Sequence, residues 1–96
     1  MVVTVLEAQV TSANVMILQE TYQQAVQNLD KGIIQTFLLN NTKDPATWQI
    51  VTIWENRMVL DAMRQSGDTP RGVLIFKAAG VVPTLSVYDV VVNGMR

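Results

Sequence analysis

The sequence predicts a single α+β domain whose elements follow the order β-α-β-β-α-(α)-β, close to the ferredoxin-like or split βαβ arrangement. Three observations lead to this prediction. A chain of 96 residues is long enough for one hydrophobic core and rarely divides into two, so residues 1–96 form one domain. Four segments are rich in β-branched residues. Helical periodicity or turn residues separate these segments from one another.

The first strand and the first helix are predicted within the first 29 residues. Residues 2–10 (VVTVLEAQV) are typical of a strand, and Thr11 or Ser12 can cap the helix that follows. Residues 13–29 form this helix, with Gly32 placed to cap its C-terminal end in a left-handed conformation. Its apolar face recurs at three- and four-residue steps and comprises Val15, Leu18, Tyr22, Ala25, Val26 and Leu29.

The middle of the chain predicts a β-hairpin and a second helix. Residues 32–39 and 47–54 are the two strands, and the turn residues of 40–45 (NNTKDP) join them. Asn56 is placed to cap a helix over residues 57–65, which Ser66-Gly67 ends. The buried side of this helix is predicted to consist of Met58, Val59, Leu60, Ala62 and Met63.

Residues 71–79 are ambiguous, because their continuous apolar run is compatible with either a strand or a buried helix. Thr69-Pro70 at the start and Gly80 at the end favour a short helix. Pro83 then breaks the chain before a last strand over residues 84–92.

The strands predict a sheet with two apolar faces. In the third strand Trp48, Ile50, Thr52 and Trp54 share one face and Gln49, Val51 and Ile53 share the other. In the last strand Leu85, Val87 and Val91 oppose Tyr88, Val90 and Val92. The helices can cover only one face, so the simplest cover for the other is a second copy of the chain. The sequence therefore predicts a homodimer that pairs through the sheet face.

Composition excludes several classes of function. Apolar residues make up 49% of the chain and charged residues 16%, which excludes a disordered protein. The formal net charge of −1 provides no basic surface for nucleic acid. The chain has no cysteine and no histidine, which removes disulfides, thiolate or imidazole metal sites, a histidine-ligated haem and the Ser-His-Asp triad. The acidic residues lack the spacing of a calcium loop, so we expect neither a metal nor another cofactor.

The chain also lacks membrane and export signals. The first ten residues have neither the positive region nor the cleavage site of a signal peptide. No apolar run approaches the roughly 18 residues that a membrane span needs. We therefore expect a soluble cytoplasmic protein without a membrane partner.

The predicted third strand and second helix contain residues 48–56 (WQIVTIWEN), followed by Leu60-Asp61-Ala62. This pattern resembles the strand-then-helix signature W-E-(D/N)…ALDAH of the antibiotic biosynthesis monooxygenase (ABM) domain. Gly32 opens the second strand where that family has Pro-Gly, although Lys31 replaces the proline, and Pro83 precedes the last strand as in the family. The resemblance covers nearly the whole chain in element order. It implies a dimeric α/β barrel, in which a ferredoxin-like protomer pairs its sheet face to face with that of a partner.

The resemblance also implies an activity. Some members of this family oxidise polycyclic phenols, anthrones or quinols with dioxygen and use neither a metal nor a flavin. The deprotonated substrate reduces dioxygen, while the protein supplies a dry hydrophobic cleft, orientation and hydrogen-bond partners. A chain without histidine or cysteine is compatible with this chemistry.

Only part of the family's polar pattern is present. Trp54 matches the tryptophan at the end of the strand. The polyketide-oxidising members have an asparagine four residues before it and a tyrosine six residues after it, where this chain has Ile50 and Leu60. The haem-degrading members require a histidine and a second tryptophan, which falls at Met63, so haem degradation is not expected.

Three residues are candidates for catalysis. Trp54 can stack on an aromatic substrate or donate its indole N–H to a substrate oxygen, or it can be a core residue between helix and sheet. Tyr22 can hold a substrate oxygen or pass a proton, or it can be a core tyrosine. Asp89 alternates with apolar residues and is a candidate base if it is buried, whereas at a wet edge it would pair with a cation.

Five further residues are candidates for substrate binding: Trp48, Ile50, Leu60, Met63 and Arg64. Trp48 can equally be a packing residue at the start of its strand, and the methionine can be a filler of the core. Arg57, Arg64 and Arg71 flank the second helix, where one can bind a phenolate or carboxylate or all can serve as helix-end charges.

Two main functions follow from these observations. The first is a cofactor-free monooxygenase that acts on a small hydrophobic phenol or quinol. The second is a non-catalytic dimeric barrel that binds a hydrophobic ligand or a protein partner, which the apolar residues Ile50 and Leu60 favour. An isomerase on the same fold ranks last, because the sequence offers no well-placed acid and base pair.

Overall fold

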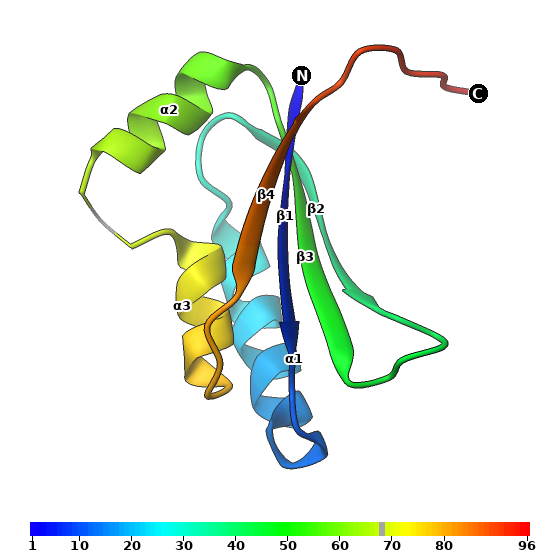
Figure 1. Ribbon diagram of the computed structural model, residues 1–96. Coiled ribbons are helices and arrows are strands. Elements are labelled where there is room, and N and C mark those ends of the chain that lie inside the picture. Colours follow the sequence, from blue (N-terminus) through cyan, green and yellow to red (C-terminus); the bar gives the residue numbers. More distant parts are fainter. Residues whose placement is uncertain (68) are drawn as a thin grey trace.

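The computed structural model describes residues 1–67 and 69–96 and confirms the predicted order of elements (Figure 1). The strands are β1 (Val2–Gln9), β2 (Ile33–Asn40), β3 (Thr47–Trp54) and β4 (Thr84–Asp89). The helices are α1 (Val15–Ala25), α2 (Arg57–Gln65) and α3 (Arg71–Ala78). The ambiguous segment before β4 is thus a helix, as its proline and glycine boundaries indicate.

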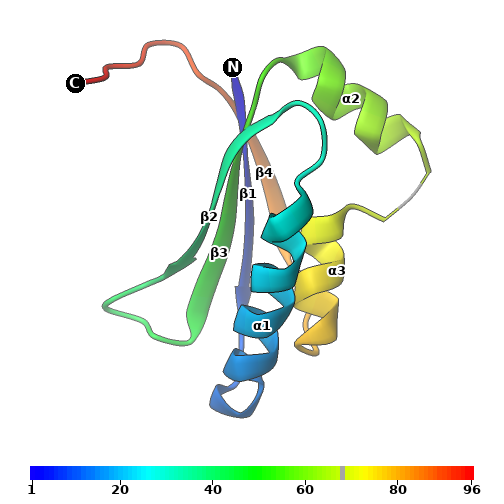
Figure 2. The ribbon, with the colours of Figure 1, turned by 180° about the vertical axis from the view of Figure 1, so that it is seen from behind.

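The four strands form one antiparallel sheet in the order β2-β3-β1-β4. Helices α1 and α3 lie side by side on one face of this sheet, whereas α2 lies toward the end where β1 begins (Figures 1 and 2). The opposite face carries no helix in either view. Among the described residues none forms a helix that is long and apolar enough to cross a membrane.

The register of the ladders determines which side chains meet the helices. Three pairs of β1 and β3 that face the helices are Val2 with Trp54, Thr4 with Thr52, and Leu6 with Ile50, and all six residues are buried. The alternate residues of both strands point to the face without helices. The division of β3 into two faces is therefore confirmed.

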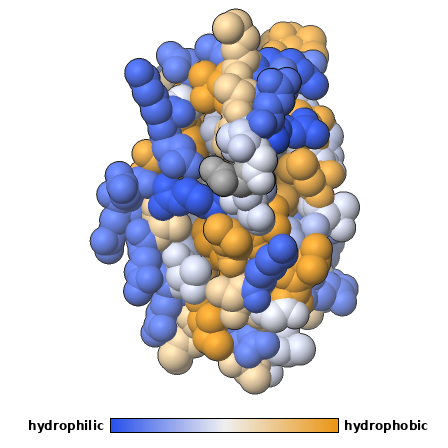
Figure 3. Space-filling view, turned by 90° about the vertical axis from the view of Figure 1, so that its left-hand side faces the viewer, coloured by the Kyte–Doolittle hydropathy of each residue, from blue (hydrophilic) through white to orange (hydrophobic). Residues whose placement is uncertain are grey.

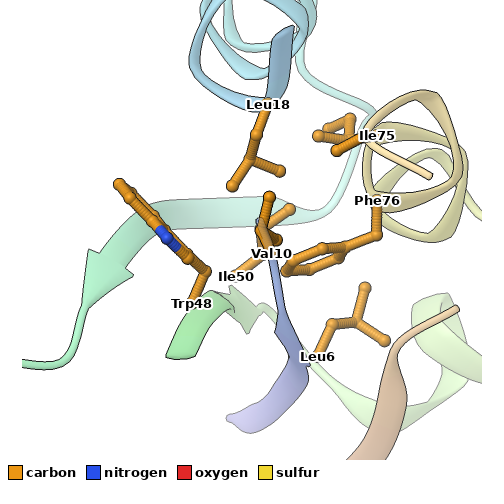
Figure 4. Packing of buried hydrophobic residues seen from close by; sticks show 8 residues of the cluster. Leu6, Val10, Leu18, Trp48, Ile50, Ile75 and Phe76 are labelled. Carbon is orange, nitrogen blue, oxygen red and sulfur yellow. The ribbon is translucent and has the colours of Figure 1, made fainter. Parts of the chain in front are cut away.

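Two hydrophobic clusters fill the space between the sheet and the helices. In the larger one, Phe76 of α3 is fully buried and its ring points toward Val10 and Ile50 (Figure 4). Leu18 of α1 is also fully buried in this cluster. The smaller cluster joins Val2, Trp54 and Leu60 near α2.

Three predicted boundaries are wrong. Helix α1 is shorter than expected, because short 3-10 turns at Ser12–Asn14 and Val26–Asn28 replace its two ends, and the Thr11 side chain makes no cap hydrogen bond. Gly32 has the predicted positive φ of 94°, but it lies at the entry to β2 and not at the helix end. Strand β4 ends at Asp89 and not at residue 92, because its only partner β1 begins at Val2, which pairs with Asp89.

The caps and the faces of the two later helices differ in part from the prediction. Asn56 caps α2 as expected, since its side chain accepts a 3.0 Å hydrogen bond from the Val59 N–H. At the start of α3, Pro70 is the cap residue and no side chain caps the helix. Met58 was expected on the buried side of α2, but 80% of it is exposed because Leu60, Val59 and Met63 form that side.

The face without helices is rich in apolar side chains. Phe37 is 38% exposed and Tyr88 is 56% exposed on this face, although both are large and hydrophobic. They share it with Val3, Val5, Leu39, Val51 and Ile53. A surface of this kind is typical of an interface, and its cover by a second copy stays a prediction.

Gly32 is expected to be the glycine least tolerant of a side chain. A Cβ at this position would lie 2.3 Å from Cγ1 of Val59, whereas a Cβ at Gly67 would meet nothing within 4 Å. Both glycines have positive φ, so Gly67→Ala should cost about 1 kcal/mol of unfolding free energy and Gly32→Ala about 2–4 kcal/mol. Urea unfolding of both variants measures the difference. The pair Gly32→Ala with Val59→Ala should recover part of the loss, and equal costs for the two glycines would contradict the contact with Val59.

Candidate functional site

The main cavity of the described structure lies between the helix-covered face of the sheet, α2 and the start of α3. Its volume is about 450 Å³, which suits a small organic ligand. It lies where the two hydrophobic clusters meet, since Leu6 comes from the larger one and Trp54 and Leu60 from the smaller. The other lining residues are Thr4, Asp30, Ile33, Thr52, Met63, Arg64, Ser66, residues 69–73 and Leu85. Figure 3 looks onto the side formed by α2 and α3, where apolar patches interrupt a hydrophilic surface.

A smaller cavity of about 60 Å³ adjoins the main one and extends it under α1. The two cavities share lining residues, among them Thr52 and Gly72. Tyr22 of α1, Thr36 of β2 and Ile50 of β3 line the smaller cavity. The side chains that line both cavities therefore separate a ligand in the main cavity from Tyr22.

Gly72 allows helix α3 to approach the sheet at the wall of the cavity. A Cβ at this position would lie 2.5 Å from Cδ1 of Leu6. A side chain at position 72 would therefore require the Leu6 side chain or the first turn of α3 to shift. This glycine therefore permits the close contact between α3 and Leu6 at the wall of the cavity.

Three threonines form a polar row across the floor of the cavities. Thr36 of β2 pairs with Thr52 of β3, which pairs in turn with Thr4 of β1, so the three lie in register on neighbouring strands. Thr4 and Thr52 are only 7% and 9% exposed, and they are the buried polar residues of the described part of the chain. The surrounding lining is mainly apolar, so Thr4 and Thr52 are the buried hydrogen-bonding side chains of the main cavity, whereas its other polar residues lie at more exposed positions.

Aromatic residues hold the two ends of the threonine row. The indole N–H of Trp54 donates a 3.0 Å hydrogen bond to Oγ1 of Thr4. The hydroxyl of Tyr22 donates a 3.2 Å hydrogen bond to Oγ1 of Thr36, which lies 3.3 Å from Oγ1 of Thr52. Both predicted catalytic aromatics therefore contact the row and fix its hydroxyl groups.

The threonine row was not among the features predicted from the sequence. Threonine is favoured in strands, so Thr4, Thr36 and Thr52 did not stand out from their neighbours. The available signal was their position: each alternates with apolar residues that face the core, where a hydroxyl group needs a partner.

Two arginines line the main cavity and differ in their contacts. Arg71 donates to the backbone carbonyls of Asn28 and Ala25, the latter at 2.7 Å, and pairs with Asp30 at 3.2 Å. It thereby satisfies carbonyl groups at the C-terminal end of α1. Arg64 of α2 has no ion-pair partner among the described residues and reaches the cavity from an exposed position.

The structure brings most of the predicted site residues together. Trp54, Leu60, Met63 and Arg64 line the main cavity. Tyr22 and Ile50 line the smaller one.

Trp48 and Asp89 lie apart from these cavities. Trp48 is buried in the larger cluster, where its indole N–H has no described partner, and it borders only an outer groove beside α1. Asp89 was considered as a base on the condition that it is buried, and this condition is not met. Its side chain is 69% exposed and pairs at 3.0 Å with Arg57, because β4 ends at this residue. The wet-edge interpretation of Asp89 is thus the correct one.

Comparison with known proteins identifies the fold. The sequence matches no protein-family model and no curated protein. A candidate antibiotic biosynthesis monooxygenase from Deinococcus radiodurans superposes with a TM-score of 0.72 at 16% identity, over 100% of both chains. A conserved protein from Methanosarcina mazei Go1 superposes with a TM-score of 0.71 at 14% identity, over 91% of this chain and 89% of that one.

A third similar structure is a variant of SnoaB, a cofactor-independent oxygenase from Streptomyces nogalater. It superposes with a TM-score of 0.68 at 14% identity, over 96% of this chain and 94% of that one. These superpositions cover nearly the whole chain, so the predicted resemblance to ABM proteins is confirmed at the level of the fold.

The two arginines of the cavity should differ in their effect on stability. Arg71→Met removes hydrogen bonds to α1 and is expected to lower the unfolding free energy by about 1–3 kcal/mol. Arg64→Met is the matched control, and its effect should stay within about 0.5 kcal/mol because no partner is lost. Urea unfolding followed by circular dichroism measures both values. Equal values for the two variants would mean that Arg71 does not hold the end of α1.

Proposed function

We propose that this protein is an ABM-type monooxygenase, which oxidises a small hydrophobic phenol or quinol with dioxygen and without a metal or flavin. The observation that carries the proposal is the cavity of about 450 Å³, whose mainly apolar walls enclose a row of hydroxyl groups. The same fold occurs in SnoaB, which is a cofactor-independent oxygenase. Cytoplasmic location, expected from the sequence, stays a prediction.

The proposed chemistry places most of the reaction on the substrate. Loss of a proton from a phenol, quinol or anthrone gives an electron-rich anion, which reduces dioxygen. For an anthrone, the methylene carbon loses two hydrogen atoms and gains one oxygen atom, and the second oxygen atom leaves as water. The protein orients the ring and excludes water from the reacting carbon.

Each lining residue takes a role that fits its contacts. Because the indole N–H of Trp54 already donates to Thr4, Trp54 offers the substrate its ring face. Leu60 and Met63 provide apolar walls, and Arg64 offers a positive charge at the edge of the cavity. Tyr22 acts through Thr36 and not by direct contact with a ligand in the main cavity. Asp89 has no role in this proposal, since it is exposed and ion-paired.

We also propose that two copies of the chain pair through the sheet face that has no helix. Exposed apolar side chains of the outer strands lie on this face, including Phe37 and Tyr88, and the half-buried valine and isoleucine side chains of β1 and β3 lie between them. The chain has a net charge of only −1, so repulsion between two copies is small. A two-fold pairing of identical faces would remove these side chains from water and close the barrel that the resemblance implies.

A second candidate function is a non-catalytic barrel that binds a hydrophobic ligand or a partner. It is favoured by Leu60, which is buried in the cavity wall where the polyketide-oxidising members have a tyrosine. Ile50 likewise replaces their asparagine and is buried in the larger cluster. These apolar residues leave the threonine row as the main source of hydrogen bonds in the cavity.

Dioxygen uptake distinguishes the two functions. With chelated metals, the protein is expected to accelerate oxygen consumption by one or more members of a panel of anthrones, naphthohydroquinones and quinols. Trp54→Phe removes the hydrogen bond that fixes Thr4 and should lower the rate about five- to tenfold. Trp48→Phe is the matched control, because Trp48 lies outside both cavities.

The outcome depends on binding as well as on uptake. If panel members bind, as judged by quenching of tryptophan fluorescence, but no uptake exceeds the uncatalysed rate, the binding module is the better interpretation. If both tryptophan variants lose activity equally, the reaction does not take place beside Trp54.

The dimer is tested by sedimentation equilibrium. At micromolar concentration the wild-type chain is expected to have the mass of two chains. Val51→Glu places a charge in the middle of the proposed interface and should give the mass of one chain, since an unpaired buried charge is strongly unfavourable. Met16→Glu is the control, because Met16 is 68% exposed on α1 and should leave the dimer intact. A wild-type mass of one chain would contradict the pairing.

A further inference from the structure

We propose that Thr4 and Thr52 form a two-donor site that binds one oxygen atom of the ligand, and that this site selects ligands with an anionic or carbonyl oxygen. The inference rests on the proposed role of the main cavity as the ligand site. It adds the atoms that recognise the ligand and the chemical class that they accept.

The two threonines face the cavity at the same level of the sheet. Thr4 and Thr52 are direct partners across the antiparallel ladder of β1 and β3, so their Cβ atoms are about 4.5–5.5 Å apart. Both side chains line the main cavity, and both are more than nine-tenths buried. One ligand atom above the ladder can therefore reach both hydroxyl groups.

The direction of the first hydrogen bond leaves the Thr4 proton free. The indole N–H of Trp54 can only donate, so Oγ1 of Thr4 is the acceptor of their 3.0 Å hydrogen bond. The hydroxyl proton of Thr4 must then be donated elsewhere, and no acceptor for it is found among the described residues. It can be donated to a group in the cavity.

A second chain of hydrogen bonds leads to Thr52. Tyr22 donates to Oγ1 of Thr36, which lies 3.3 Å from Oγ1 of Thr52. Either hydroxyl group can donate in this contact. When Thr36 donates to Thr52, the proton of Thr52 is left for the cavity, and a ligand oxygen atom beside Thr52 favours this direction. The two aromatic residues thus polarise two hydroxyl groups toward the same point.

These two donors define the ligand chemistry. A buried hydroxyl donor without an acceptor lowers the stability of the protein. An oxygen atom placed between Thr4 and Thr52 would accept a hydrogen bond from each and so remove both penalties. A negatively charged oxygen gains more than a neutral one, because charge-assisted hydrogen bonds are stronger. A phenolate, an enolate or a quinone carbonyl therefore fits, whereas an ammonium group does not.

The same donors would favour the ionised form of a bound phenol. When the O–H bond of the phenol breaks, its proton leaves to water and its oxygen keeps the electron pair, which accepts hydrogen bonds from Thr4 and Thr52. The chain contains no histidine that could perform this task. Stabilisation of the anion by these two hydroxyls would supply the electron-rich species that the proposed oxidation needs.

The test uses 2-naphthol, whose ionised form has its own absorption band, and naphthalene, which has the same rings without an oxygen. Thr52→Val is expected to weaken binding of the naphtholate about tenfold, because one charge-assisted hydrogen bond is lost, and to leave naphthalene binding unchanged. The absorbance of the bound ligand should show a smaller ionised fraction at each alkaline pH. Thr52→Ser should restore both properties.

Two further variants complete the experiment. Thr4→Val is expected to weaken naphtholate binding as Thr52→Val does. It also leaves the Trp54 N–H without its partner, so circular dichroism checks that this variant folds. If Thr4→Val does not fold, the result for Thr52→Val decides the test. Thr84→Val is the matched control, because Thr84 is exposed and outside the cavity. The proposal is overturned if Thr52→Val binds naphtholate as tightly as wild type does. It is also overturned if the affinity of this variant for naphthalene falls as much as its affinity for naphtholate.

These results are separate from the fate of the oxygenase proposal. Selective loss of naphtholate in Thr52→Val, combined with no oxygen uptake by any quinol, supports the two-donor site and rejects the oxygenase. Oxygen uptake that is unaffected by Thr52→Val, combined with unchanged naphtholate binding, rejects the two-donor site alone.

Discussion

The ladder between β1 and β3 is the constraint on which the rest of the structure depends, because it fixes which side chains face the helices. Its register aligns Thr4 with Thr52 and Leu6 with Ile50 on one face of the sheet. A slip by one residue would exchange this face for the other and would place valines where the hydroxyl groups now lie. Strands β2 and β4 pair in register with β3 and β1, so the pairing of β1 with β3 also determines the positions of the threonine row and of the apolar core beside it.

The cavity lies between α2 and α3, which pack on different parts of this sheet. Gly72 brings the start of α3 against Leu6, while Arg71 ties the same turn to the end of α1. Helix α2 packs instead on Trp54 through Leu60, at the end of the sheet where β1 begins. The two clusters therefore do not merge into a single packed core. The space between them is the cavity, and its polar atoms come from the strands beneath it.

Much of this fold follows from local patterns in the sequence, whereas the site depends on register. The four strands, the order of the helices and the cap at Asn56 were predicted, because alternation, helical periodicity and capping residues are local signals. The end of β4 was not, since it is set by where β1 begins. Asp89 was a candidate base only if it is buried, and the shorter strand leaves it beside Arg57 in solvent. The contact of Trp54 with Thr4 joins residues 50 positions apart, and no local pattern could reveal it.

The period of two in a strand lets the same short segments serve two purposes. In β3, Thr52 and Trp54 point into the cavity, while Val51 and Ile53 point to the face that we propose as the dimer interface. Valine in place of Thr52 would fit the same space and spare the chain a buried hydroxyl. Two such hydroxyls, one bonded to Trp54 and the other linked to Tyr22 through Thr36, are therefore poorly explained by stability alone. Their position opposite each other on the cavity floor connects the packing of this sheet with the proposed binding of a ligand oxygen atom.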